Sequence, residues 1–278
     1  MNVLQPLIGT IQAAASCDLY STTPTTPTQE TGKISGLVTW PLIDFATTPT
    51  GVGTLSTSTS IQGVMLRFST PITCNAILLL LKEKYWYYRN TSVSYWTSAS
   101  STAQTVQAGA AIKSVAGPLS TELLQGFTLA QTLTDVTAIF IPLIKGAGAT
   151  GFTMGEVAAV TVTDMPETPI RDTYTITPTQ SNLQTVTCQN GRQVQYYNST
   201  LTYNVNMEYA WSDEGTKAAE LTSINETRLL NGSPLIYIPA APSAIDRPIY
   251  LVNVPQAPEI IHSDAKVYHI TFQGVTQP

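Results

Sequence analysis

The chain is 278 residues long and carries few charges: only 11% of its residues are Asp, Glu, Lys or Arg, roughly half the usual share of about a quarter. Its formal net charge is −5 and no cluster of Lys or Arg occurs, so the sequence lacks the basic surface that holds the phosphates of nucleic acids. Hydrophobic residues make up 43% of the chain, which suffices for one large or two ordinary domains.

Residues 1–32 are expected to form one or two short strands followed by a Pro/Thr-rich segment. Residues 21–32 read STTPTTPTQETG, a composition that favours neither a helix nor a buried core. We therefore expect a linker or, alternatively, an extended arm that lies across a neighbouring subunit. Residues 1–17 lack the basic start of a signal peptide, and no apolar run approaches the ~20 residues that span a membrane.

Residues 33–165 have an almost continuous β pattern, and the polar tract 97–110 within them predicts a long exposed loop. The alternation in the run VMLRF predicts a half-buried strand with Arg67 facing water, whereas the run ILLLL has no alternation and predicts a strand covered on both faces. Short strands separated by turn residues predict a jelly roll or other β-sandwich. The expected strands are 34–40, 62–68, 76–81, 92–96, 126–129, 138–143 and 155–163.

Four segments of this region follow one another in a recognisable order. An apolar strand at Ala76–Leu81 precedes the aromatic strand Val93–Trp96, and AIFIP at Ala138–Pro142 precedes GFTMGEV at Gly151–Val157. This order resembles the discoidin-type galactose-binding-like sandwich, in which a strand with aromatic residues precedes a loop and a Gly-apolar-x-Glu-apolar element leads into the last strand. The resemblance covers about residues 60–165 and implies the fold alone.

A domain boundary is predicted at residues 164–172, DMPETPIRD, which hold two prolines and most of the local charge. Beyond it, Asn190-Gly191 predicts a hairpin turn. One helix is expected after Ser212, a suitable N-cap, and Asn231-Gly232 would end it. The expected strands are 173–177, 183–188, 194–197, 201–209, 235–238, 249–254 and 266–272.

The second domain is therefore expected to be a small β-barrel or sandwich with one helix, closing with YHITFQGV at Tyr268–Val275. Several strands, one helix and then further strands resemble the tail-tube-like fold of bacteriophage tail and baseplate proteins. A discoidin-like sandwich joined to such a barrel is similar to distal-tail and baseplate components. The resemblance implies a mainly β virion protein with a sandwich at 33–165 and a barrel at 166–278.

Aromatic residues gather in two neighbouring segments and form the candidate binding site. Aromatic faces stack on the apolar faces of sugar rings, and their OH and NH groups can hydrogen-bond sugar hydroxyls. We expect contact with a glycan or a protein partner, although the same pattern also fits rings that fill a core and cover an interface. The candidate residues are Trp86, Tyr87, Tyr88, Tyr95 and Trp96.

The remaining reactive residues give no support for catalysis, metal binding or a cofactor. His262 and Asp264 are close in sequence to Glu259, but no third ligand or nucleophile is evident, so a surface loop is expected there. The motifs of serine hydrolases, zinc proteases and P-loop NTPases do not occur, and we expect no enzyme. The cysteines are odd in number and far apart, which predicts buried free thiols: Cys17, Cys74 and Cys188.

The expected function is that of a virion structural protein in a bacteriophage tail or baseplate. Its expected partners are other copies of itself and neighbouring virion proteins, with no nucleic acid and no membrane. A low-charge surface can be buried against a partner without leaving charges unpaired. The alternatives are a glycan-binding module or adhesin that uses the aromatic residues, and a capsid decoration protein.

Overall fold

The structure is a computed structural model, and it describes most of the chain. The described residues are almost entirely β, with helical backbone at Ala219 and Ser223; the mainly β class predicted from the sequence is confirmed. The ranges are 5–34, 54–56, 61–81, 86–88, 92–113, 124–145, 151–165, 175–180, 184–187, 193–196, 201–212, 219, 223, 235–240, 249–253, 259–264 and 267–276.

The chain divides into two compact units. Unit 1 comprises Met1–Leu4, Gly9–Val162 and Ala241–Pro248. Unit 2 comprises Gln5–Ile8, Thr163–Ala240 and Ile249–Pro278. Strands β1 and β9 each have residues in both units. The domain bounds at 33–165 and 166–278 stay a prediction.

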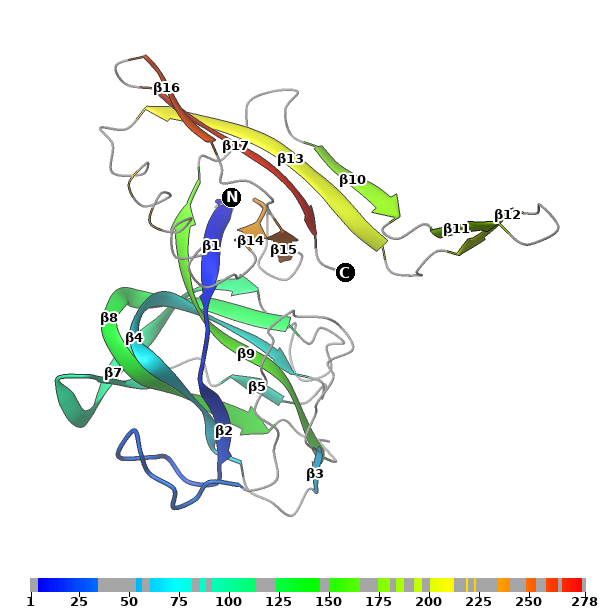
Figure 1. Ribbon diagram of the computed structural model, residues 1–278. Helices are drawn as coiled ribbons and strands as arrows, with labels where there is room; N and C mark the ends of the chain where they lie inside the picture. The colour runs from blue at the N-terminus through cyan, green and yellow to red at the C-terminus, as the bar shows by residue number, and fades with distance from the viewer. Residues whose placement is uncertain are drawn as a thin grey trace. The chain divides into compact units, whose positions relative to one another are not determined.

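The strands of unit 1 are long and pair antiparallel, with β4 and β8 at the centre (Figure 1). The order is β1-β9-β4-β8-β6-β7, with β2 added to β4, β3 to β9 and β5 to β8. Their bounds are β1 Leu7–Gln12, β2 Ser16–Tyr20, β3 Thr54–Ser56, β4 Gly63–Leu81, β5 Trp86–Tyr88, β6 Ser92–Thr97, β7 Ser100–Lys113, β8 Leu124–Lys145 and β9 Gly151–Asp164.

Each of the two central strands takes part in two layers of sheet. In layer A, residues 63–67 of β4 pair with β2 and with residues 138–142 of β8, which continue to β6 and the first half of β7. In layer B, residues 76–80 of β4 pair with β9 and with residues 124–128 of β8, next to the second half of β7. The result is β-sandwich-like.

Strands β4 and β8 each bend where they pass from one layer to the other, and this bend explains why the sequence predicted separate short strands. The expected strands 62–68 and 76–81 are the two halves of β4, and 126–129 and 138–143 lie in the two halves of β8. The pairing of β4 with β8 shifts register between Arg67 and Ala76, and Asp135 takes a positive φ of 59°. Irregular pairing of this kind lets a strand bend from one layer to another, and the polar residues at the bend had the composition of a loop.

The polar tract 97–110 is not a loop, contrary to the prediction. Ser98 and Ala99 make a turn, and β7 begins at Ser100 and runs to Lys113. Among the described side chains of β7, only Val106 and Ile112 are buried. The alternation of apolar and polar residues that reveals a half-buried strand is therefore almost absent from β7.

The main core of unit 1 fills the space between the two layers. It joins Leu66 of β4, Tyr95 of β6, Phe127 and Ile139 of β8, and Val157 of β9, among others. The four residues Ala76–Leu79 are completely buried, which confirms that this part of β4 is covered on both faces. Both core faces of the sandwich are therefore built from the apolar runs visible in the sequence.

A second, smaller cluster covers the opposite face of layer A. Met65, Tyr20, Trp96 and Phe140 pack there, with the rings of Tyr20 and Phe140 edge to face at 6.5 Å. The prediction that the VMLRF strand is half-buried is therefore wrong, because Met65 on its second face is completely buried.

The Pro/Thr-rich segment folds back onto unit 1 of its own chain, whereas a linker or an arm was expected. The amide of Ser21 donates to the carbonyl of Gly32, and the amide of Ile34 donates to the carbonyl of Leu19, both at 2.8 Å. Pro24 is buried. We call residues 21–34 the cover segment, because these bonds hold it along the outer edge of β2.

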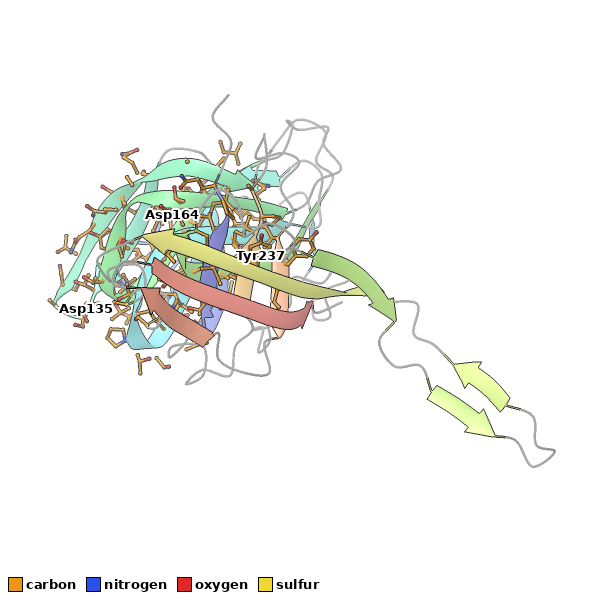
Figure 2. All side chains as sticks on the ribbon, turned by 90° about the horizontal axis from the view of Figure 1, so that it is seen from above. Asp135, Asp164 and Tyr237 are labelled. Atoms are coloured by element: carbon orange, nitrogen blue, oxygen red, sulfur yellow. The ribbon has the colours of Figure 1, made fainter. Side chains whose placement is uncertain are left out.

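Unit 2 is a second antiparallel arrangement of shorter strands. Its order is β10-β13-β17-β15-β14, with β16 added to β17. All four residues of β14 are buried, and Tyr237 (labelled in Figure 2) stacks on Tyr250 of β15 at 6.5 Å. The bounds are β10 Thr175–Gln180, β13 Leu201–Ser212, β14 Leu235–Ile238, β15 Tyr250–Asn253, β16 Glu259–Asp264 and β17 Val267–Thr276.

A separate hairpin completes unit 2. Strands β11 Gln184–Thr187 and β12 Gln193–Tyr196 form a two-stranded sheet of their own, which extends away from β10 and β13 in both views (Figures 1 and 2). Its turn, including Asn190-Gly191, lies outside the described residues. The predicted helix is represented by Ala219 and Ser223 alone, so its caps stay a prediction.

Candidate functional site

Two of the five predicted aromatic residues belong to the interior of unit 1. Tyr95 and Trp96 are consecutive in β6, so their side chains point to opposite faces of layer A. Tyr95 is 8% exposed, lies in the main core and donates its hydroxyl to Oε1 of Gln104 at 2.8 Å. Trp96 is completely buried in the smaller cluster. Neither ring has a face free to stack on a sugar, so the expected glycan contact is wrong for these two residues.

The other three aromatic residues form a short strand. Trp86, Tyr87 and Tyr88 make up β5, which pairs antiparallel with Lys145, Ile144 and Leu143 of β8. Their side chains lie outside the described part of the structure. A glycan or partner contact at these three positions stays a prediction.

The histidine and carboxylates that were set aside as non-catalytic lie in a strand. Glu259, His262 and Asp264 lie in β16, not in the expected surface loop, and the pairing of β16 with β17 is irregular between His262 and Asp264. The run GAGATG at 146–151 has the spacing of a dinucleotide-binding loop, but its last glycine begins strand β9, whereas such a loop opens a helix. Neither segment has the context of a catalytic motif.

The strongest polar cluster of unit 1 centres on Arg67, which was expected to face water. Its guanidinium donates to the carboxylate of Asp18, to the hydroxyl of Tyr20 and to the carbonyls of Pro27 (2.6 Å) and Gln29 (3.1 Å). The donors of a guanidinium point in fixed directions from one planar group, so this side chain binds a strand and the cover segment at once. Its side chain is only 19% exposed.

Lys33 completes the cluster from the end of the cover segment. Its Nζ lies 3.1 Å from Oδ1 of Asp18 and 3.3 Å from Oε2 of Glu30. The hydrogen bond to Asp18 raises the pKa of Lys33 above its usual 10.5, although partial burial acts in the opposite direction. The donors and acceptors of the cluster bond to one another, so the cluster acts as a clamp that holds the cover segment against the strands of unit 1.

The sequence contains the charged residues of this clamp, but it does not show that they pair. Asp18 and Arg67 are 49 positions apart, and their pairing depends on the register of β2 against β4. In a chain with so few charges, an arginine inside an apolar strand indicates a buried partner. The partner itself is fixed only by the fold.

Among the strands whose side-chain exposure the structure describes, β7 has the largest number of uncharged exposed residues. Eight of its residues are exposed and none of them is charged. Val106 and Ile112 face inward and anchor the strand to the sandwich. The exposed residues are Ser101, Thr102, Gln104, Thr105, Gln107, Gly109, Ala110 and Ala111.

Two of the three cysteines are buried free thiols, as predicted. Burial, and next the charge of Asp18, raise the pKa of Cys17; burial raises the pKa of Cys74 to about 12. Cys188 lies outside the described residues. Within the described ranges, no three metal-type side chains gather into a potential site, and no helix combines the length and apolar character of a membrane span.

Comparison of the chain with protein-family models, with curated proteins and with solved structures found no match.

Proposed function

We propose that this chain is a structural subunit of a virion, in the tail or baseplate of a bacteriophage, where it associates with copies of itself and links neighbouring tail proteins. The observation that carries the proposal is β7, a 14-residue strand on which every residue described as exposed is uncharged. Surfaces without charge can be buried in an assembly at little desolvation cost. The resemblance of the strand order to distal-tail proteins supplies the biological setting.

The β-sandwich-like unit 1 would be the galactose-binding-like sandwich of this setting, and unit 2 would be the tail-tube-like barrel. Support for the first comes from the long antiparallel strands around one core between two layers. Support for the second comes from the strand order in which helical residues 219 and 223 lie between β13 and β14. Both assignments are open to direct structural test.

The proposal is tested by electron microscopy and sedimentation velocity of the purified chain. A subunit of this kind is expected to form rings, stacked rings or short tubes. A monomer at all accessible concentrations would contradict it. Antibody labelling of particles then gives the position, because label on the head would instead identify a capsid decoration protein.

The alternative, a glycan-binding module, now depends on β5 alone. Trp86→Ala and Trp96→Ala distinguish the two roles of the aromatic residues on a glycan array. The adhesin reading predicts a sugar ligand that is lost in Trp86→Ala, while Trp96→Ala is expected to unfold the core. Absence of any sugar binding by the wild-type chain removes this alternative.

A further inference from the structure

Exposed edges of β-sheets are usually protected, because a row of unpaired amides and carbonyls recruits other strands. Three edges in the described part of this protein follow that rule. The outer edge of β2 is covered at its C-terminal end by residues 32–34, through the bridge between Tyr20 and Lys33 and the two amide bonds of the cover segment. Edge strand β10 contains Pro178, and β16 carries Glu259, Asp264 and an irregularity.

Strand β7 lacks proline and charge along its first half, and its pairing with β6 is regular from Gln104 to Gln107. It stands at the end of the strand order, and within the described residues its outer side has no partner strand. From Ser100 to Gln107 it contains no proline and no charge. Its pairing is irregular on both sides of this stretch, with β6 between Ser100 and Gln104 and with β8 from Ala108 to Lys113. The other unprotected edges among the described strands are those of β3 and β5, with three residues each, and of β11 and β12, with four.

The two faces of this edge are well defined. Val106 points into the main core, and Gln104 on the same face meets the hydroxyl of Tyr95. Ala103 packs on the opposite face against the cluster that contains Trp96. Thr105 lies on that second face and is exposed. The strand is therefore held by both faces while its edge is left open.

We propose that the outer edge of β7 at residues Gln104–Gln107, which has no partner among the described residues, pairs antiparallel with the same edge of a second copy of this chain, so that layer A continues from one copy into the other. A two-fold axis relates the two copies, and the pairing gives hydrogen-bond partners to both edges at once. It rests on the proposed function and names the partner at that surface.

Self-complementarity is the argument for a second copy as the occupant. In an antiparallel pair, opposite residues lie on the same face. Every register that keeps the faces aligned sets Ser, Thr, Ala, Gln and Val against one another, with no charge on either side. A foreign strand with charged side chains would find no oppositely charged side chain along this edge.

The test places a positive charge on the edge in one variant and a negative charge at the same position in another. Thr105→Lys in both copies brings two ammonium groups either directly opposite or two positions apart, within about 7–8 Å. We expect self-association to weaken roughly tenfold or more, measured by sedimentation equilibrium. Thr105→Glu is expected to behave in the same way. An equimolar mixture of the two variants should restore association, because the introduced ammonium group of one copy then meets the introduced carboxylate of the other.

The matched control is Thr70→Lys, which adds the same charge at an exposed position of β4. It should associate like the wild type. Circular dichroism and thermal unfolding verify that all three variants are folded, and restoration in the mixture is itself evidence of folding.

The outcomes separate this inference from the proposed function. If the wild type assembles and the Thr105 variants assemble equally well, the β7 pairing is wrong and the assembly role stands. If the Thr105→Lys and Thr105→Glu variants are both weakened and their mixture stays weakened, the contact is not a β7–β7 pair. If the wild type is a monomer at every concentration, both fail.

Discussion

Replacement of Arg67 by methionine should release the cover segment. Methionine keeps most of the aliphatic volume but removes the donors that hold Asp18, Pro27 and Gln29. The carboxylate of Asp18 is only 15% exposed, and it would keep Lys33 as its one remaining cation among the described residues. The substitution therefore leaves a partly buried carboxylate with one of its two cations and the hydroxyl of Ser16.

The size of the effect follows from the burial of the pair. A hydrogen bond to a charged group contributes about 1.5–3 kcal/mol, and removal of one partner of a buried ion pair costs about 3–5 kcal/mol. Arg67 is about a fifth exposed, and the freed carbonyls of the cover segment can bind water. We therefore expect a loss of about 2–4 kcal/mol in the stability of the cover segment against opening.

Hydrogen exchange measures this opening directly. The amides of Ser21 and Ile34, which bond to Gly32 and Leu19, should exchange roughly 30- to 1,000-fold faster in Arg67→Met. Lys33→Met is the control, because its partly exposed pair with Asp18 should contribute less than about 1 kcal/mol. Equal exchange in the wild type and Arg67→Met would refute the clamp.

Three further predictions concern single groups. Cys74, with a pKa of about 12 and complete burial, should resist alkylation at about pH 8, where an ordinary thiol reacts, until the chain is unfolded, as followed by mass spectrometry of its peptide. The pKa of Lys33 is raised above 10.5 by Asp18, so its stabilisation is complete below pH 10.5 and is lost as the pH rises through the folded-state pKa; the difference in unfolding free energy between wild type and Lys33→Met should vanish there. Gly63→Ala places a Cβ 2.4 Å from the carbonyl oxygen of Ile141 and should cost about 1–3 kcal/mol in urea unfolding; an unchanged midpoint would contradict the packing of β4 on β8.

Much of the strand content was predictable because apolar runs mark the buried halves of each strand. The run 235–238 coincides with β14, and 92–96 with most of β6. The continuity of β4 and β8 was not predictable, because their corners contain Ser, Thr, Pro and Asp, which also compose turns. Whether such residues bend a strand or end it depends on pairing with a distant partner.

The candidate site was only partly predictable for the same reason. Tyr95 and Trp96 had the composition of a binding platform, but the two layers of unit 1 bury both of them. The cover segment read as a linker, because Pro and Thr have little to bury; its anchor is an arginine 40 positions away from Pro27. Strand β7 was missed because its signal lies in backbone pairing, while its side chains are polar.

The central claim is that copies of this chain meet through the open edge of β7. Hydrogen exchange of the amides in Gln104–Gln107 tests it most directly, at protein concentrations above and below the midpoint of self-association. The account predicts that part of these amides is protected in the assembly and exchanges rapidly after dilution, while the amides of β4 stay protected throughout. Equal exchange of β7 at both concentrations, with assembly still present at the higher one, would contradict it.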